Sequence, residues 1–101
     1  MVLGHERCGA VTATVNNKGK PEGNIGAIIS AIQPSAKKAQ EIYKGTSNEE
    51  LVECAVELNA RAVAASLPKK SKALAELLKE GKLKIVAAKY DLDDGKVTLL
   101  K

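Results

Sequence analysis

Residues 2–11 of this 101-residue chain read VLGHERCGAV, and this stretch decides the fold. It opens with an apolar run that ends in Gly4, which is typical of the last part of a buried strand. From Cys8 to Val15 the residues suit a short helix. The stretch therefore predicts a strand that leads through a short polar loop into a helix. His5 and Cys8 stand three residues apart on that loop.

His5 and Cys8 are residues of the types that bind zinc. An imidazole nitrogen and a thiolate approach one zinc ion to about 2.0–2.3 Å. The amino end of a helix favours the thiolate form of a cysteine, and the flanking Gly4 and Gly9 allow close approach. We therefore predict that His5 and Cys8 are metal ligands. The spacing alone is a weak signal, because His-x-x-Cys pairs recur by chance and a lone histidine or buried cysteine is more often structural.

Several helices are predicted beyond this stretch. Residues 16–23 are dense in helix breakers and predict a loop. Apolar residues at helical spacing then indicate a helix over residues 25–32, and Pro34 favours the first turn of a separate helix that ends near Tyr43. Ser47 with a glutamate three residues later is a capping box, which predicts the start of a long helix.

The carboxyl-terminal part predicts the end of that helix, another helix and two strands. Pro68 limits the long helix after Leu67, and a shorter helix runs from Ser71 to Gly81. Residues 83–90 contain an unbroken apolar run that suits a strand buried on both faces of a parallel sheet. Asp94-Gly95 then predicts a hairpin, with a short return strand over residues 97–100. The order predicts an α/β fold with a partial, mostly parallel sheet that is flanked by helices and ends in a hairpin.

The composition allows one small domain, or a piece of one, over residues 1–101. Phe and Trp are absent, so the core has to be built from Ala, Val, Leu and Ile. Small aliphatic residues bury less area than aromatic ones, and we therefore expect the chain to need a partner subunit.

Charge and hydropathy exclude other classes. The net charge of +4 is scattered and only 2% of residues are aromatic, which argues against nucleic-acid binding. No apolar run is long enough for a membrane span, and the amino end lacks the pattern of a signal peptide. We predict a cytoplasmic protein that binds neither nucleic acid nor membrane.

The motifs together resemble those of the β-class carbonic anhydrases. The loop with His5 and Cys8 resembles the second zinc motif of that family, Gly-His-x-x-Cys-Gly-Ala-Val. Further stretches are similar to the family in the same order, so that the resemblance covers essentially the whole chain: residues 23–26, 31–34, 53–59, 74–77, 81–86 and 90–97.

The resemblance implies a zinc lyase that interconverts carbon dioxide and bicarbonate. In the family, two cysteines and one histidine hold the metal, and zinc lowers the pKa of bound water to about 7, which supplies hydroxide for attack on carbon dioxide. His5 and Cys8 match two of the three protein ligands, and Gly9 falls where a main-chain amide contacts substrate or an anion. The resemblance also implies a homo-oligomer with active sites near the subunit boundary.

One family motif is absent from this chain. The motif Cys-x-Asp-x-Arg supplies one ligand and an Asp-Arg pair, and neither Cys8 nor Cys54 begins it. No residue is therefore predicted as catalytic. An even share of the roughly 10–16 kcal/mol of a four-ligand zinc site leaves two ligands with about 5–8 kcal/mol, which means micromolar to sub-millimolar binding.

Several explanations of the absent motif stay open. The chain is a truncated product, one half of a split enzyme, or a self-associating chain in which two His-Cys pairs meet. A rival from another class is a non-catalytic binding or assembly module with a vestigial metal site.

Three further residues near these motifs have simpler interpretations. Cys54 lies on the apolar stripe of the long helix and is interpreted as a structural thiol. Glu6 and Arg7 are expected to face solvent or a subunit contact, and Arg7 is the nearest candidate for attracting an anion.

Overall fold

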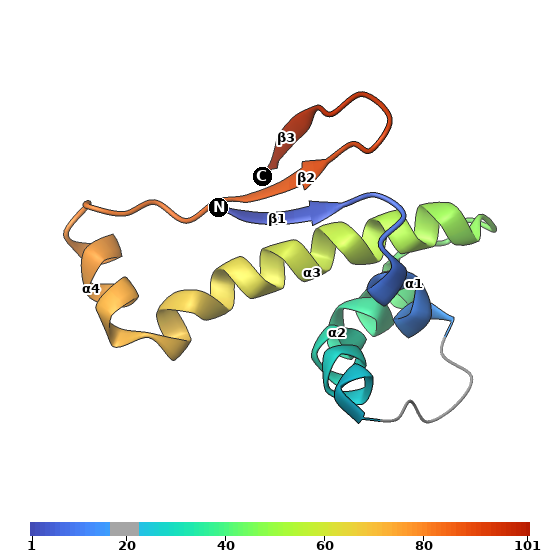
Figure 1. Cartoon of the computed structure of the whole chain (residues 1–101), viewed down its shortest axis with the longest axis horizontal. Coiled ribbons are helices and arrows are strands. Elements are labelled where there is room, and N and C mark those ends of the chain that lie inside the picture. Colours follow the sequence, from blue (N-terminus) through green and yellow to red (C-terminus); the bar gives the residue numbers. More distant parts are fainter. Residues whose placement is uncertain (17–22) are drawn as a thin grey trace.

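The computed structural model describes residues 1–16 and 23–101, and Figure 1 shows the arrangement of its helices and strands. The loop predicted over residues 16–23 lies, apart from its two end residues, outside the described residues. The elements follow in the order β1 (Val2–His5), α1 (Gly9–Val15), α2 (Gly23–Ile42), α3 (Asn48–Lys70), α4 (Lys72–Lys79), β2 (Ala87–Tyr90) and β3 (Val97–Leu100).

The three strands form one mixed sheet in the order β1-β2-β3. β1 and β2 are parallel and place Leu3 beside Ala88, whereas β2 and β3 are antiparallel and place Ala88 beside Leu99. The predicted hairpin is confirmed: Gly95 adopts a φ of 74°, which glycine tolerates at low cost, and the Asp91 N–H donates to the Lys96 carbonyl. The α/β fold class predicted from the sequence is confirmed.

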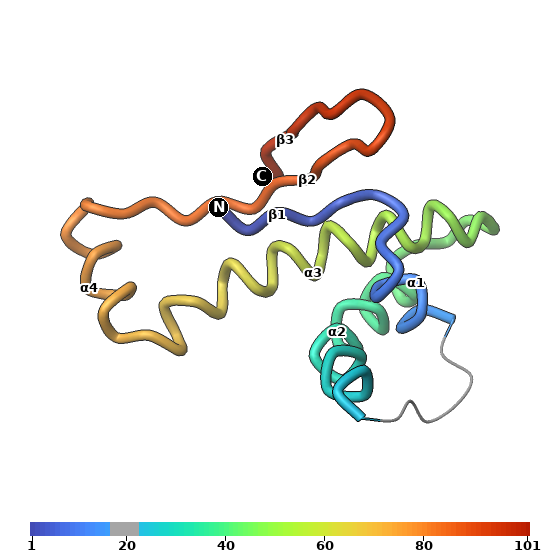
Figure 2. Tube along the Cα trace, in the orientation of Figure 1, coloured from blue at the N-terminus to red at the C-terminus, as the bar shows by residue number. Residues whose placement is uncertain are grey.

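Helix α3 is the centre of the fold. It runs along one face of the sheet, and α1 and α2 pack against it from the side away from the sheet (Figures 1 and 2). Gly4 permits this close packing, because a Cβ at that position would lie 3.0 Å from Val56 Cγ1 and 3.6 Å from Ala60 Cβ. The carboxyl end of β1 is thereby held against the middle of α3.

The core is built from small aliphatic side chains, as the composition predicts. It joins α1, α2 and α3, and its buried members are Val11, Ile32, Ala39, Val52, Ala55 and Val56.

The predicted start of the long helix is confirmed, with one difference in its capping. The Ser47 hydroxyl accepts a hydrogen bond from the Glu50 N–H at 3.2 Å. The return arm of the capping box passes through Tyr43, whose hydroxyl donates to the Glu50 carboxylate at 2.6 Å and accepts from the Ser47 N–H at 3.3 Å. The hydrogen bond to the Glu50 carboxylate raises the pKa of Tyr43.

The break predicted at Pro34 is wrong, because α2 is continuous through that proline. An internal proline costs about 3 kcal/mol through its missing N–H and its steric clash. Ile29, Ile32, Ala36 and Ala39 nevertheless form one buried stripe that crosses Pro34. Burial of an isoleucine contributes about 1.5–3 kcal/mol, so the stripe outweighs the proline.

Two other boundaries differ from the prediction. The long helix continues past Pro68 to Lys70, since a proline in the last turn removes one hydrogen bond and the Ser71 N–H still bonds the Leu67 carbonyl. The strand predicted over residues 83–90 is shorter, starting at Ala87. β1 begins at Val2, opposite Ala87, so residues 83–86 have no β1 residue beside them.

Candidate metal site at the end of the first strand

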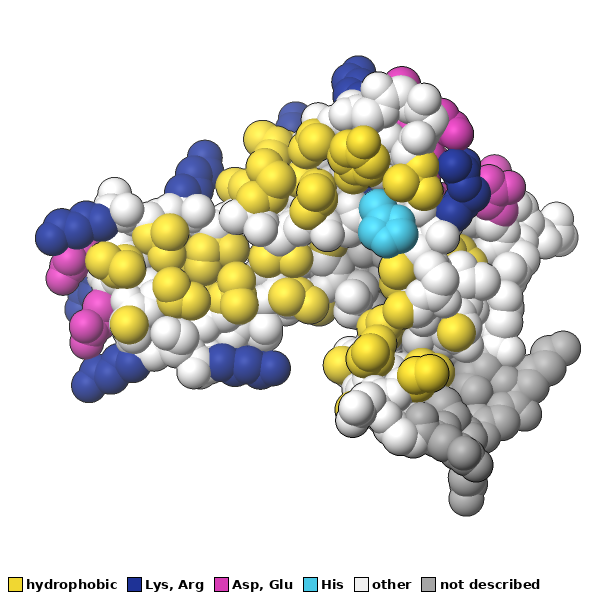
Figure 3. All heavy atoms as spheres, viewed as in Figure 1, with side chains coloured by type: hydrophobic (Ala, Val, Ile, Leu, Met, Phe, Trp, Pro, Cys, Tyr) yellow, Lys and Arg dark blue, Asp and Glu magenta, His cyan; other side chains and the backbone are white. Residues whose placement is uncertain are grey.

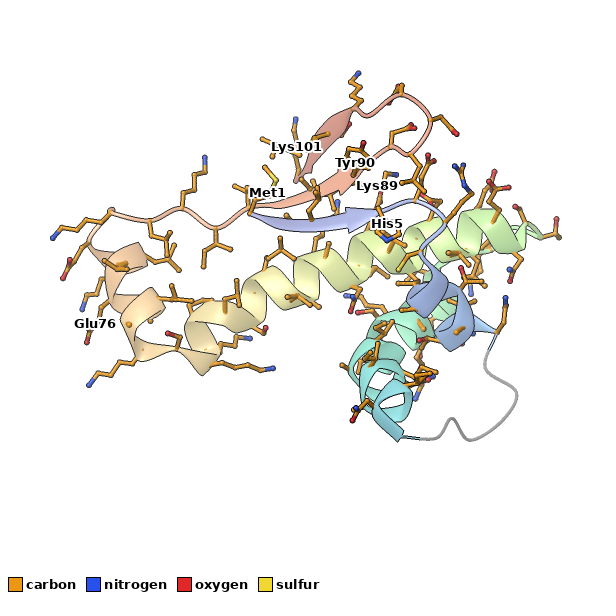
Figure 4. All side chains as sticks on the ribbon, viewed as in Figure 1. Met1, His5, Glu76, Lys89, Tyr90 and Lys101 are labelled. Atoms are coloured by element: carbon orange, nitrogen blue, oxygen red, sulfur yellow. The ribbon has the colours of Figure 1, made fainter. Side chains whose placement is uncertain are left out.

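His5 is the last residue of β1 and is exposed, and Figure 4 shows it where this strand ends beside α3. Its Nδ1 lies 2.9 Å from the main-chain carbonyl oxygen of Glu6. In the tautomer with the proton on Nδ1, the ring donates to this carbonyl and Nε2 keeps a free lone pair. Histidines that bind metals are commonly oriented by a hydrogen bond of this kind.

Cys8 is the residue that immediately precedes α1. Its thiol is free and partly buried, and it packs against the core. Its carbonyl accepts hydrogen bonds from the Thr12 N–H at 2.9 Å and from the Thr12 hydroxyl at 2.7 Å. The first turn of α1 therefore fixes the main chain at Cys8.

His5 and Cys8 line the same cavity, which has a volume of about 150 Å³. Asn59 of α3 also lies in its wall and accepts a long hydrogen bond, 3.5 Å, from the Ser35 hydroxyl. Asn59 was not predicted as a site residue, although a carboxamide within an apolar helix face is a usable signal. The other lining residues are glycine or apolar: Val2, Leu3, Gly4, Val11, Ile32, Val56, Ala60 and Val63.

The loop between the two predicted ligands is tied to distant parts of the chain. The Glu6 carboxylate accepts hydrogen bonds from the Leu92 N–H at 2.6 Å and the Asp93 N–H at 3.2 Å, in the turn between β2 and β3. The Arg7 N–H donates to the Glu53 carboxylate of α3 at 3.1 Å. The side chain of Glu6 is 18% exposed and is turned toward the chain's own hairpin rather than toward solvent, whereas the alternative expectation, a subunit contact, stays a prediction.

Arg7 has an unusual backbone conformation, with a φ of 51°. Its guanidinium remains about half exposed and contacts Asp93, with NH2 to Oδ1 at 3.1 Å. The hydrogen bond and charge of Asp93 raise the pKa of Arg7. Arg7 therefore binds a carboxylate of its own chain, and this contact competes with the role of anion attraction predicted for it.

Comparison with known proteins identifies the family. The family model described as carbonic anhydrase matches residues 1–97. The chain belongs to the carbonic anhydrase family. Carbonic anhydrase 2 of Mycobacterium tuberculosis is 31% identical over 102 aligned residues, which cover 98% of this chain and 47% of that protein. The chain thus spans about half the length of the curated relatives it matches.

Solved structures show that the fold is that of the β-class carbonic anhydrases. The β-carbonic anhydrase CafA of the fungal pathogen Aspergillus fumigatus matches with a TM-score of 0.84 and 24% identity, covering 98% of this chain and 46% of CafA. The β-carbonic anhydrase CcaA matches with a TM-score of 0.84 and 22% identity, covering 99% of this chain and 49% of CcaA. The predicted resemblance is confirmed, and this carbonic anhydrase chain corresponds to about half of each relative.

Gly9, the remaining predicted site residue, and the second cysteine, Cys54, lie outside the cavity wall. Gly9 is the exposed first residue of α1 and is not among the cavity-lining residues. Cys54 of α3 is also absent from the lining and packs against the core. Burial raises the pKa of the Cys54 thiol, and the charge of Glu57 adds to this increase. The interpretation of Cys54 as a structural thiol agrees with this placement.

A group of carboxylates near Arg7 is occupied by internal contacts. Glu6, Asp91 and Asp93 bring carboxylate oxygens within 4.8 Å of one another. Asp91 accepts hydrogen bonds from the Asp93 N–H at 2.8 Å and the Asp94 N–H at 3.3 Å, and these bonds hold the pKa of Asp91 below its ordinary value. With Asp93 paired to Arg7, the group serves to fix the turn between β2 and β3.

A helix that spans a membrane has to be both long and apolar. Over residues 1–16 and 23–101, no helix combines the length and the apolar character needed to cross a bilayer.

Proposed function

We propose that this chain is part of a zinc-dependent carbonic anhydrase that reversibly hydrates carbon dioxide to bicarbonate, with His5 and Cys8 as zinc ligands. The observation that carries the proposal is that both residues line one cavity in a chain whose residues 1–97 match the carbonic anhydrase family. We also keep the prediction of a cytoplasmic location.

The imidazole of His5 and the sulfur of Cys8 are of the chemical types that bind zinc. An imidazole nitrogen with a free lone pair and a thiol are both ligands that zinc prefers. Catalytic zinc sites have three protein ligands, however, and His5 and Cys8 supply two. The proposal therefore requires that the third ligand comes from outside residues 1–101: from a further part of the same polypeptide, from another copy or from a different chain.

Zinc, when bound, is a Lewis acid that lowers the pKa of water to about 7. The residues of this chain have separate tasks. The apolar wall, with Val11, Ile32 and Val56, suits a small apolar substrate such as carbon dioxide and limits the access of bulk water. The main-chain amide of Gly9 remains our candidate for a contact with substrate or an anion.

The exposed surface of the chain is larger than expected for a folded monomer of its mass. The chain exposes 6951 Å², about 1,500 Å² more than a folded monomer of 10.6 kDa is expected to expose. Obligate interfaces bury about 1,000–2,500 Å² on each partner, so the excess is of that size. Figure 3 shows apolar side chains gathered over the sheet and over the region of α3 and α4. We propose a homo-oligomer as the functional form.

A second candidate, one half of a split enzyme, is favoured by the free edge of β1. The Val2 N–H donates to the Val86 carbonyl and the Glu6 N–H to the Tyr90 carbonyl, so these residues face β2. Successive residues of a strand point their main-chain N–H and C=O groups to opposite edges. The N–H and C=O groups of Leu3 and His5 therefore point away from β2. Within the described residues the sheet ends at β1. An added strand would therefore lie beside the cavity.

Zinc titration of matched cysteine variants tests the ligand assignment. We expect wild type to bind zinc in the micromolar to sub-millimolar range, since two ligands contribute about 5–8 kcal/mol. Cys8→Ser and His5→Ala should each weaken binding at least about 10-fold, because each removes one of the two ligands. Cys54→Ser is the control, since it removes the other thiol of the chain. Equal affinity of the Cys8→Ser and Cys54→Ser variants contradicts the assignment.

Two solution measurements test the partner. Sedimentation should show a dimer or larger species, and hydration activity should then depend on protein concentration. For the split enzyme, activity should appear when the chain is mixed with a folded polypeptide that carries the Cys-x-Asp-x-Arg segment. A monomer that gains no activity on mixing contradicts both the homo-oligomer and the split enzyme, and leaves the truncated product and the non-catalytic module.

A further inference from the structure

Glu6 is held through its N–H and its carboxylate, and its carbonyl oxygen contacts the ring of His5. The Glu6 N–H donates to the Tyr90 carbonyl of β2 at 3.2 Å. One carboxylate oxygen of Glu6, Oε1, accepts from both the Leu92 and the Asp93 N–H groups. The Glu6 carbonyl oxygen lies 2.9 Å from His5 Nδ1. The position of this carbonyl, and with it the orientation of the imidazole, depends on how firmly Glu6 is held.

We propose that Glu6 is a positioning residue for the predicted metal ligands, acting through its carboxylate on the turn between β2 and β3. We call the hydrogen bonds from the Leu92 and Asp93 amides to Glu6 the latch. The inference rests on the proposed function, because it treats His5 and Cys8 as ligands. Glu6 itself is not a ligand in this proposal.

The geometry favours a positioning role over a merely stabilising one. Arg7, the next residue, has a positive φ, a backbone conformation that side chains other than glycine rarely adopt. Its N–H is bound to Glu53 of α3. The loop is therefore bent between two anchors, the latch on one side and α3 on the other. Release of either anchor lets Glu6 and Arg7 relax and separates His5 from Cys8.

The latch connects parts of the chain that are distant in sequence. Glu6 precedes Leu92 by 86 residues. The carboxyl-terminal hairpin thus helps to orient a side chain at the amino end. Hydrogen bonds that orient metal ligands from outside the ligand set typically contribute 10- to 100-fold, roughly, in metal affinity.

Three substitutions of Glu6 separate the effect of side-chain length, which sets the reach of the carboxylate, from the effect of its charge. Glu6→Ala removes the latch. Glu6→Gln keeps one carbonyl oxygen at the same reach for both amides, which bond a single oxygen, Oε1, and it gives up only the 3.6 Å ion pair of Oε1 with Arg7. Glu6→Asp keeps the charge and shortens the reach. Glu76→Ala, at an exposed glutamate of α4, is the control for loss of a charge.

The readouts are amide hydrogen exchange at Leu92 and Asp93 and the zinc dissociation constant. We expect Glu6→Ala and Glu6→Asp to accelerate exchange at both amides and to weaken zinc binding about 10-fold. Glu6→Gln should stay within about threefold of wild type and Glu76→Ala should match it, since reach rather than charge makes the latch. The absorption spectrum of bound Co²⁺ should change in the Ala and Asp variants and not in the Gln variant.

Two results overturn the proposal. Unchanged exchange at Leu92 and Asp93 in Glu6→Ala shows that the latch does not form. Accelerated exchange with unaltered zinc affinity shows a latch that only stabilises the turn. Failure of the proposed function is distinguishable from both, because wild type then binds neither zinc nor Co²⁺ while the exchange data still report on the latch.

Discussion

The two halves of α3 belong to one continuous helix but have different surroundings. In the first half, Val52, Ala55, Val56 and Ala60 are buried between the sheet and the helices α1 and α2. Beyond Ala60, none of the residues described in α3 and α4 is buried. Helical pattern alone is therefore not evidence of burial, because burial depends on which other elements the chain supplies.

The second half shows what the single chain leaves uncovered. α4 has leucines on one side, and Leu77 stays 39% exposed. Val63 of α3 is 40% exposed and lies at the cavity with His5 and Cys8. An amphipathic helix without a buried residue is expected where a partner covers it. These exposed apolar side chains are part of the excess surface that the proposed oligomer would cover.

The two halves of α3 should differ most in how much the free energy of unfolding falls when a valine is replaced by alanine. Val56→Ala should lower the free energy of unfolding by about 2 kcal/mol, because it removes buried methyl groups and leaves a cavity. Val63→Ala is the matched control on the same helix and should cost less than about 0.5 kcal/mol. Urea unfolding of the two variants measures both values at one protein concentration.

The reverse result would change the interpretation. If Val63→Ala lowers the free energy of unfolding as much as Val56→Ala does, Val63 is covered by a partner in solution. The effect of Val63→Ala should then decrease when the protein is diluted. Equal losses of unfolding free energy in the two variants, at every protein concentration, would contradict the difference in burial between the two halves of α3.

The next prediction compares the serine caps of the two regions. Ser47 accepts from the Glu50 N–H at the start of α3, and Ser71 accepts from the Leu74 N–H at the start of α4. Ser47→Ala should lower the global free energy of unfolding by about 1 kcal/mol. Ser71→Ala should leave that value nearly unchanged and accelerate amide exchange within α4, because a sparsely packed helix opens locally before the whole chain unfolds.

Equal global effects of the two serine variants would show that α4 unfolds together with the core. In that case the second half of α3 is more firmly packed than its exposure indicates. Amide exchange and urea unfolding on the same samples distinguish the two cases.

Much of this fold could be predicted from residues that lie close together in the sequence. The cap at Ser47 and the Asp94-Gly95 turn depend on neighbours in sequence, and both were found where expected. The break predicted at Pro34 failed because a buried stripe from the tertiary structure outweighs a local penalty.

The candidate site also contains residues that local sequence predicted and residues that it did not predict. His5 and Cys8 were recognisable because the local motif that contains them resembles the second zinc motif of the β-class carbonic anhydrases, and both residues line one cavity of the structure. The contacts of Glu6 with the turn between β2 and β3 were missed, since their partners are 86 and 87 residues away. Asn59 was missed for a related reason, because only the packing of α3 against β1 brings it to the cavity.

The smallest predicted effect concerns Lys89, which joins β2 to the first half of α3. Its ammonium group lies 3.0 Å from Glu57 and 3.4 Å from Glu53. The hydrogen bond to Glu57, followed by the charges of both glutamates, raises the pKa of Lys89 against the opposing effect of burial. A raised pKa means that the folded state binds the proton more tightly than the unfolded state does.

The stabilisation by Lys89 is therefore complete below the unfolded pKa of about 10.4 and is lost as the pH rises through the folded pKa. For a partly exposed pair we expect about 1 kcal/mol or less. The difference in unfolding free energy between wild type and Lys89→Met should be constant from neutral pH to about pH 10 and should narrow above it. Lys72→Met, at an exposed lysine of α4, should show no such pH dependence. A difference that instead grows as the pH rises toward the unfolded pKa would mean that the folded pKa of Lys89 is lowered and that its charged form is destabilising. The contrast between the two halves of α3 would then rest on packing alone.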